Sequence, residues 1–456
     1  MVALVEDFPH AAGMTEKQLL GMRGRLDRFL HELVEPMGRS ERRHWAQIYV
    51  QGLLLDGQRK SVQPIAERIA GADVQALNQF LNQSPWDVTE IQRRLARRLS
   101  EDGEKPVYWV VDETSFPKAG DHSVGVARQY CGALGKIANC QVAVSLHWSQ
   151  DEVSYPISWR LFLPEDWIND ALRRQEAGIP AEVVHRTKQA LALELIAKAR
   201  DWSLPPGIVL ADSAYGNDFD FRQELRARGL RYAVAVEPKT AVWLEDPNVP
   251  PPTSDGKRGR PWRHPRPVDR PPVFSLLEVA KKLAPAAWRT VTWRTGTKGP
   301  QTSRFALVKA WAAHSWKQRP REQPPRVSEW LLIEWPKGAA QPSDYWMLWN
   351  HSGDAAPALR SAVHAARGRW KIEQDYRELK DELGLDHFEG RGWLGWHHHV
   401  TLVSLAFCFL RSEQARSKKN FWCEPSDDPP AAPSKPDPNG GPMSVVPDEI
   451  QRHLLT

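Results

Sequence analysis

The sequence predicts a mixed α/β fold: a mixed sheet with flanking helices, an N-terminal helical domain, and a β-rich insertion before the last helix of the sheet domain. Three observations lead to this. Over residues 1–100, apolar positions recur every three or four residues with no strand pattern between them. Short apolar runs then alternate with helical segments, which is typical of a mixed sheet. A long stretch rich in Pro, Trp and Arg separates these elements from a final strong helix.

Composition excludes several classes of protein. The chain has 456 residues, of which 41% are hydrophobic and 26% charged, so it can bury a real core and form several domains. No apolar run reaches the length of a membrane span, and the N-terminus lacks the features of a secretory signal. We therefore expect a cytoplasmic protein. The four cysteines show no CxxC pairing, which argues against a zinc ribbon or a disulfide framework. A net charge of +5 is too small to prove a polyanionic partner.

Residues 1–100 are predicted to form the helical domain, because the helical period is clear in LLGMRGRLDRFLHELV, RRHWAQIYVQGLLL and VTEIQRRLARRL. Arginines cluster on two of these helices and would either bind DNA or form solvated helix faces: Arg39, Arg42 and Arg43, then Arg93, Arg94, Arg97 and Arg98.

Residues 101–236 are predicted to form the first part of the sheet domain. Short runs of β-forming residues predict strands, and helical spacing predicts the segments between them. In chain order the expected elements are strands at Val107–Val111, Ser123–Tyr130 and Cys140–Trp148, a helix at Ala181–Asp201, a strand at Ile208–Ala211, a helix at Asp218–Arg228 and a strand at Arg231–Val236.

Residues 237–345 are predicted to form the insertion, with short strands at Trp288–Thr295, Phe305–Trp311 and Trp330–Trp335. Residues 346–412 would complete the sheet domain with a strong helix from Pro357, a suitable first-turn proline, to about Leu383. Residues 413–456 are expected to be a disordered tail, since their composition cannot bury enough apolar surface.

Three carboxylates are candidates for one site. Asp112 and Asp212 each follow an apolar strand, and ligands bind at the carboxyl ends of strands in open sheets. Glu373 lies beside the apolar stripe of the last helix and is flanked by cations. Carboxylate oxygens suit Mg²⁺ or Mn²⁺, and two such ions can drive phosphodiester cleavage. The alternative is structural: a strand-end Asp is often a cap or turn residue, and Glu373 would then be one half of a surface ion pair.

Four sequence blocks resemble those of bacterial insertion-sequence transposases of the DDE superfamily. The resemblance covers roughly residues 15–412 and rests on VVDETSFPK at 110–118, SVGVARQY at 123–130, ANCQVAVSL at 138–146 and LGLDHFEGR at 383–391. The related Y-x2-R-x3-E-x6-K signature is met by Arg369, Glu373 and Lys380. It fails at Ala366, where the tyrosine would stand, which puts that tyrosine's contact in doubt and leaves the metal site unaffected.

The resemblance implies an RNase H-like domain in which Asp112, Asp212 and Glu373 hold two Mg²⁺ or Mn²⁺ ions. It implies cutting and joining of double-stranded DNA at the terminal inverted repeats of an element and at a target, by a homodimer in a synaptic complex. Arg369, Arg377 and Lys380 would contact phosphate near the cut. The alternative is a non-catalytic DNA-binding regulator derived from such an enzyme. A glycosidase would leave the cations around Glu373 unexplained.

Other segments are weaker candidates for binding. Arg258 and Arg260 lie in an Arg-Gly-Arg-Pro core that resembles a minor-groove AT-hook, or they belong to a solvated basic loop. The insertion tryptophans would mostly pack a small sheet, although one of them could stack on an extruded base: Trp288, Trp293, Trp311, Trp316, Trp330, Trp335, Trp346 and Trp349. His397, His398 and His399 are not expected to bind a metal, because adjacent helical residues point in different directions.

Overall fold

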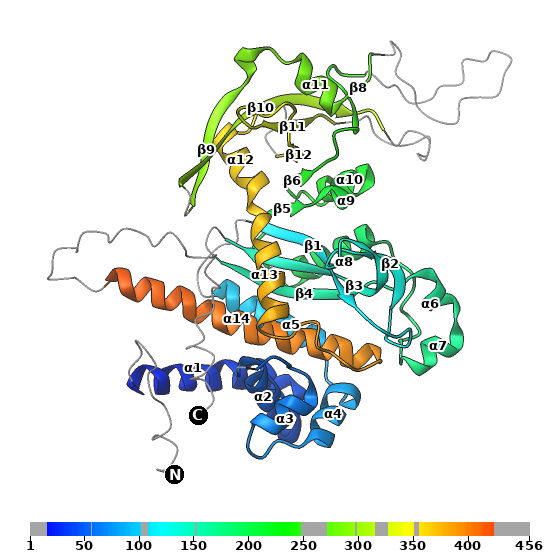
Figure 1. The fold of residues 1–456 in the computed structure, drawn as a ribbon, viewed down its shortest axis with the longest axis vertical. Helices are drawn as coiled ribbons and strands as arrows, with labels where there is room; N and C mark the ends of the chain where they lie inside the picture. The colour runs from blue at the N-terminus through cyan, green and yellow to red at the C-terminus, as the bar shows by residue number, and fades with distance from the viewer. Residues whose placement is uncertain are drawn as a thin grey trace.

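The computed structural model describes residues 16–55, 57–101, 108–150, 153–247, 271–296, 299–314, 327–350 and 355–423. Figure 1 shows a central sheet with the insertion at one end and the N-terminal helices at the other. The long C-terminal helix α14 (Trp393–Cys423) lies between those helices and the sheet.

Five strands of the sheet have the order and direction of an RNase H-like fold, as predicted. The order is β4–β3–β1–β5–β6, with β3 antiparallel to both β1 and β4, and β5 and β6 parallel to β1. These strands are β1 (Tyr108–Pro117), β3 (Lys136–Ser149), β4 (Ser154–Leu161), β5 (Ile208–Ala211) and β6 (Tyr232–Ala235). The strand predicted to end at Val111 continues to Pro117, so Asp112 lies within β1, whereas Asp212 follows the end of β5 as predicted.

Two differences from the sequence prediction concern the strands around β3. The strand expected at Ser123–Tyr130 begins later, as β2 (Ala127–Cys131). Gly125 precedes it at φ 75°, where a Cβ would lie 2.9 Å from the Phe162 carbonyl oxygen, so the chain turns there. Strand β4 was not predicted at all. It contains Pro156, which is tolerated because β4 is an edge strand and its ladder shifts register at this point.

Helices connect the strands of the sheet domain. Between β4 and β5 lie α6 (Glu165–Asn169), α7 (Ala171–Glu176) and α8 (Lys188–Asp201). Helix α8 begins seven residues later than expected, because the Thr187 side chain accepts a hydrogen bond from the Ala190 N–H at 3.2 Å and caps it. Between β5 and β6 lie α9 (Ser213–Gly216) and α10 (Phe219–Ala227).

The insertion extends the same sheet. Strand β12 pairs antiparallel with β6, and the order continues β12–β11–β10–β7–β8, with β9 on the outer side of β10. The elements are β7 (Ala241–Trp243), β8 (Phe274–Ser275), α11 (Leu276–Lys282), η2 (Pro285–Ala287), β9 (Arg289–Gly296), β10 (Gly299–Ala312), β11 (Glu329–Trp335) and β12 (Asp344–Trp349). The boundary placed after residue 345 therefore cuts through β12.

The C-terminal part differs from the prediction in two ways. The single helix expected from Pro357 to Leu383 is two helices, α12 (Leu359–Gly368) and α13 (Trp370–Asp381), which meet at Arg369. The disordered tail expected from residue 413 is wrong for residues 413–423, which continue α14, and residues 424–456 lie outside the described residues. Glu413 is buried in α14 and accepts a hydrogen bond from Arg25 Nε of α1 at 2.8 Å, which fixes this part of the helix.

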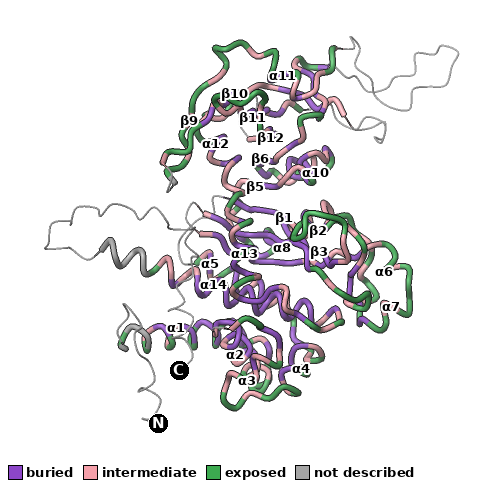
Figure 2. The backbone as a smooth tube through the Cα atoms, viewed as in Figure 1, coloured by how far each residue is buried: buried purple, intermediate pink, exposed green. Residues whose placement is uncertain are grey.

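The N-terminal helices pack on α14, which makes them part of one core. They are α1 (Glu16–Val34), η1 (Glu35–Met37), α2 (Ser40–Leu54), α3 (Val62–Arg68), α4 (Val74–Gln83) and α5 (Val88–Glu101). The Tyr49 hydroxyl and His399 Nδ1 lie 2.9 Å apart, and Gln92 Nε2 donates to Thr401 Oγ1 at 3.1 Å. Figure 2 shows the central strands and much of α14 buried.

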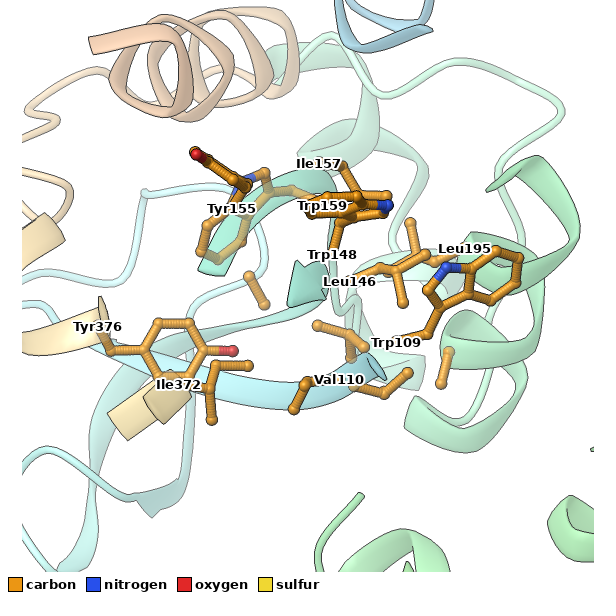
Figure 3. Packing of buried hydrophobic residues seen from close by; sticks show 14 of the residues in the cluster. Trp109, Val110, Leu146, Trp148, Tyr155, Ile157, Trp159, Leu195, Ile372 and Tyr376 are labelled. Atoms are coloured by element: carbon orange, nitrogen blue, oxygen red, sulfur yellow. The ribbon is translucent and has the colours of Figure 1, made fainter. Parts of the chain in front are cut away.

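Helix α13 packs its apolar stripe on the sheet. Ile372, Leu379 and Tyr376 are buried, and Figure 3 shows Ile372 and Tyr376 beside the strand that carries Val110. The Tyr376 hydroxyl lies 2.7 Å from Ser145 Oγ on β3. This contact fixes the rotation of α13 about its axis, and so determines which of its side chains face β1.

Candidate active site

Asp112 and Asp212 lie on neighbouring parallel strands. The ladder pairs Tyr108 with Ile208 and Val110 with Leu210, so continuing it places Asp112 beside Asp212. Adjacent strands are about 4.8 Å apart, which brings the two backbones within reach of one ligand. Asp212 also caps α9, with its Oδ1 accepting from the Ala214 N–H at 3.0 Å. Asp212 thus makes the capping bond expected of an Asp that follows a strand. This bond uses Oδ1 and leaves Oδ2 outside the cap.

Arg369 joins Asp112 to Glu373. Its Nη1 lies 2.6 Å from Asp112 Oδ2, and its Nη2 lies 2.7 Å from Glu373 Oε1. The two carboxylates therefore face each other across one planar guanidinium group. Asp112 is buried, whereas the Glu373 side chain is 54% exposed. The structure thus connects, through Arg369, two carboxylates that are 261 positions apart in the sequence.

The charges of the three carboxylates interact. Burial raises the pKa of the Asp112 carboxyl to about 7; the Arg369 cation acts against this rise and nearby Asp212 adds to it. Burial alone would lower the pKa of Arg369, but attraction to Asp112, Asp212 and Glu373 holds it above its usual value. All three carboxylates therefore attract the Arg369 cation, which indicates a region of negative electrostatic potential around it.

The carboxylate of Glu113, next to Asp112 in the sequence, points away from this region of negative potential. Glu113 follows Asp112 on β1, and its Oε1 lies 2.8 Å from Lys188 Nζ of α8, on the other face of the sheet. Side chains alternate between the two faces along a strand, which explains why Glu113 and Asp112 point in opposite directions.

The donor set suits a divalent metal that prefers oxygen ligands. Asp112, Asp212 and Glu373 offer carboxylate oxygens, and the only cationic side chain that contacts two of them in the described part of the chain is Arg369. Among the described residues, no three Asp, Glu, His or Cys side chains are already arranged around a point where a metal ion could bind. The Arg369 guanidinium lies between Asp112 and Glu373 and donates to both carboxylates.

The residues predicted to contact DNA fall into three groups. Arg377 is exposed on α13, the helix of Glu373. Lys380 is half-buried and donates from Nζ to the Ser115 carbonyl oxygen at 2.9 Å, and burial lowers its pKa. Arg258 and Arg260 lie outside the described residues.

The arginines of the N-terminal helices are partly used within the protein. Arg93 pairs with Glu90 at 2.6 Å, Arg94 with Glu35 at 2.8 Å, and Arg98 with Glu32. These contacts favour the structural interpretation of that face.

The three adjacent histidines are structural. His397, His398 and His399 contact the backbone carbonyl oxygens of Trp393, Leu81 and Gly384 respectively, and burial lowers the pKa of each. Their side chains contact three different backbone segments, so the three rings do not converge on one point.

Most described insertion tryptophans pack within the protein. Trp311 and Trp346 are buried, Trp288 and Trp335 make an edge contact at 5.5 Å, and Trp293 meets Phe305 at 5.7 Å. Trp316 lies outside the described residues. Ala366, at the tyrosine position of the signature, is buried on α12.

A buried polar cluster that connects α13 with β3 and α14 was not predicted from the sequence. His147 Nδ1 lies 3.3 Å from Asp375 Oδ2, and Asp375 Oδ1 accepts from Arg411 Nη2 at 3.2 Å. Arg411 also pairs with Glu378 at 2.8 Å. The sequence did contain a signal for this cluster. Asp375 and Glu378 lie on the core-facing side of a helix, and a carboxylate is too costly to bury there without a partner.

The fold and the acidic site together define an RNase H-like nuclease. The chain belongs to the DDE superfamily endonuclease family, whose sequence model matches residues 32–300. That match includes Asp112 and Asp212 and ends before Glu373.

Comparison with individual proteins gives two further likenesses. The chain is 32% identical over 187 residues to the probable transposase for insertion sequence element IS701 of Microchaete diplosiphon, a match that covers 41% of this chain. The match spans 46% of that relative, about half its length. A cryo-EM structure of the piggyBac transposase synaptic complex with hairpin DNA shares 11% identity and a TM-score of 0.33, over 95% of this chain and 92% of that one. In the described part of the chain, no helix has the length and apolar character needed to cross a membrane.

Proposed function

We propose that this protein is a DNA transposase that cuts and joins DNA at the ends of an insertion sequence, with Asp112, Asp212 and Glu373 as its metal-binding residues. The observation that carries the proposal is that Arg369 bridges Asp112 of β1 and Glu373 of α13, while Asp212 follows the adjacent parallel strand β5 in an RNase H-like sheet. Membership of the DDE endonuclease family and the likeness to an insertion-sequence transposase support it.

Each residue has a distinct role in this proposal. Two Mg²⁺ or Mn²⁺ ions, when bound, would activate a water or a 3′-hydroxyl and stabilise the leaving oxygen. Asp112, on a central strand, and Asp212, held by its capping bond, provide rigid oxygen ligands. Glu373 is exposed on its helix and adds a third carboxylate from the solvent side. Arg369, with Arg377 and Lys380 on the same face of the helix, would hold the phosphate backbone near the cut.

The proposed partners are double-stranded DNA with the terminal inverted repeats of the element, target DNA, and a second copy of the chain. Joining two ends requires two active sites held together, which a homodimer in a synaptic complex provides. A regulator that binds DNA without cutting it is the second candidate. Intact carboxylates at all three motif positions count against it, because a binding protein has no use for a buried Asp with a raised pKa.

Cleavage of the element's own ends tests the proposal. Asp112→Asn should reduce nicking in Mg²⁺ by at least about a thousandfold and leave binding to the ends largely intact, because the lost charge serves the metal. Asp381→Asn is the matched control: it removes an exposed carboxylate at the end of α13 and should cut normally. Chelation of divalent ions should abolish cleavage by the wild type. Retained cleavage by Asp112→Asn would remove this residue from the mechanism.

A further inference from the structure

The hairpin formed by β2 and β3 carries an exposed apolar tip. Tyr130, Leu134 and Ile137 have 61%, 48% and 61% of their surface exposed, respectively. Tyr130 and Ile137 are direct cross-strand partners, so their side chains lie next to each other on one face of the hairpin. Large apolar side chains that cluster at an exposed tip are unusual without a binding partner.

The tip projects from the edge of the sheet that carries the catalytic carboxylates. The β1–β3 ladder ends where Pro117 pairs with Cys140, and the hairpin continues beyond it in the direction of the β1 carboxyl end. Figure 1 shows β2 beside α6 and α7 on the side away from α13. Ser145 pairs with Asp112, and Ile137 precedes Ser145 by eight residues on β3, so the tip lies roughly 26 Å from the candidate active site.

The charge of the hairpin indicates an anionic partner. Arg128 and Lys136 are exposed close to the apolar residues. Between residues 127 and 150 the chain contains no Asp or Glu. An apolar pair flanked by cations is what proteins use to unstack base steps in deformed duplex DNA, with the cations holding the phosphates.

We propose that the tip, Tyr130, Leu134 and Ile137, is a DNA-contacting wedge that engages the duplex roughly eight base pairs from the cut, the span that 26 Å covers at 3.4 Å per base pair. This rests on the proposed function, since it takes DNA as the ligand of the neighbouring active site. The apolar side chains press against a base step that is already bent, and Arg128 and Lys136 contact the adjacent phosphates.

Binding to a mismatched duplex tests the wedge. A fluorescent duplex with the element end is compared with one that has a single mismatch about eight base pairs from the cut site, using Asp112→Asn protein so that the DNA stays intact. The wild-type tip should prefer the mismatched duplex, because unstacking there costs less. The double variant Tyr130→Ser/Ile137→Ser should lose this preference and bind the mismatched duplex about tenfold more weakly. Leu172→Ser, on an exposed leucine of α7, is the matched control and should bind as the parent does.

A second variant separates base contacts from phosphate contacts. Arg128→Gln/Lys136→Gln should reduce the salt slope of binding by about 2 on both duplexes and leave the mismatch preference in place. An unrelated duplex with the same mismatch distinguishes target DNA from element ends: a preference there too would assign the wedge to both.

Three outcomes would overturn the inference. Equal mismatch preference in the Tyr130→Ser/Ile137→Ser variant and its parent would exclude a wedge. An equal loss of mismatch preference in the Leu172→Ser variant would indicate a general effect of surface hydrophobicity. If light scattering shows that the Tyr130→Ser/Ile137→Ser variant no longer self-associates while its DNA binding is unchanged, the tip binds a second copy of the chain. Failure of the proposed function is distinguishable from all three, since it is the absence of metal-dependent cleavage by the wild type.

Discussion

At the scale of single residues, Arg369 determines the state of the site. It lies at the junction of α12 and α13 with helical backbone angles, φ −64° and ψ −28°, so the chain passes through it with little change of direction. Its guanidinium donates to Asp112 and Glu373 and lies where their oxygens would otherwise bind a cation. In the proposed function, arginine and metal would compete for the same oxygens, and a DNA phosphate would offer Arg369 an alternative partner.

Removing the guanidinium should strengthen metal binding. Arg369→Gln is expected to bind Mn²⁺ about tenfold more tightly than the wild type in the absence of DNA, measured by calorimetric titration, because two carboxylate oxygens are released and one cation is lost. The same variant should bind DNA more weakly. Arg377→Gln removes an equal charge on the same helix without bridging the carboxylates, and should change Mn²⁺ affinity far less. If both variants bind Mn²⁺ equally well, the effect is general electrostatics and the competition does not exist.

At the scale of elements, the sequence predicts strands and helices that have a regular local pattern. It does not predict features that depend on pairing between distant segments. Asp112 and Asp212 were predictable because each follows a short apolar run, although β1 continues past Asp112 to Pro117, and β5 was located in full from its apolar run. Strand β4 was missed because Pro156 interrupts its pattern, and only the register shift against β3 accommodates it. The division of the last helix at Arg369 was also not predicted, and the contact of this residue with Asp112 joins segments 257 positions apart. Residues far apart in sequence decide such features.

A buried ion pair joins the insertion to the sheet domain. Arg222 Nε of α10 donates to Glu329 Oε1 of β11 at 2.7 Å, and the Tyr232 hydroxyl of β6 donates to the same oxygen at 2.6 Å. Burial alone would raise the pKa of Glu329, but Arg222, Arg226 and these hydrogen bonds lower it to about 2. The three elements therefore share one buried charge pair, in addition to the pairing of β6 with β12.

Glu329→Gln should destabilise the fold by about 3 kcal/mol at pH 7, because Arg222 is left buried without its counter-ion. Urea unfolding measures this. The folded-state pKa lies below the ordinary 4.5, so the contribution is fully present above pH 4.5 and is lost as the pH falls toward about 2. The difference between wild type and variant should shrink over that range. Glu224→Gln, on an exposed ion pair of α10, should cost less than about 1 kcal/mol. Equal losses would contradict the special role of the buried pair.

At the scale of the whole molecule, α14 holds the N-terminal helices against the sheet. His398 contacts the Leu81 carbonyl oxygen at 2.8 Å and stacks on Trp86, with ring centroids 3.7 Å apart. On the other side of α14, Ser404 Oγ accepts from Trp159 Nε1 of β4 at 2.8 Å. Helix α14, which reaches into the segment expected to be a disordered tail, is thus a central element of the core. The sequence does not reveal this, because α14 is apolar on several faces and its neighbours come from both ends of the chain.

Acid should loosen this assembly before it affects the rest of the core. Burial lowers the pKa of His398 to about 4, below its ordinary value of 6.5, so its contribution to stability is present above pH 6.5 and is lost as the pH falls through about 4. His398→Gln keeps a polar side chain that cannot take up a proton. Its stability should fall less than that of the wild type between pH 6.5 and 4, by about 3 kcal/mol if the whole pKa shift is expressed. Denaturant unfolding across this range measures the slope, and His122→Gln, on an exposed histidine, should leave it unchanged. If the His398→Gln slope equals that of the wild type, protonation of the α14 interface is not what limits stability in acid, and the buried carboxylates of α13 become the next groups to test.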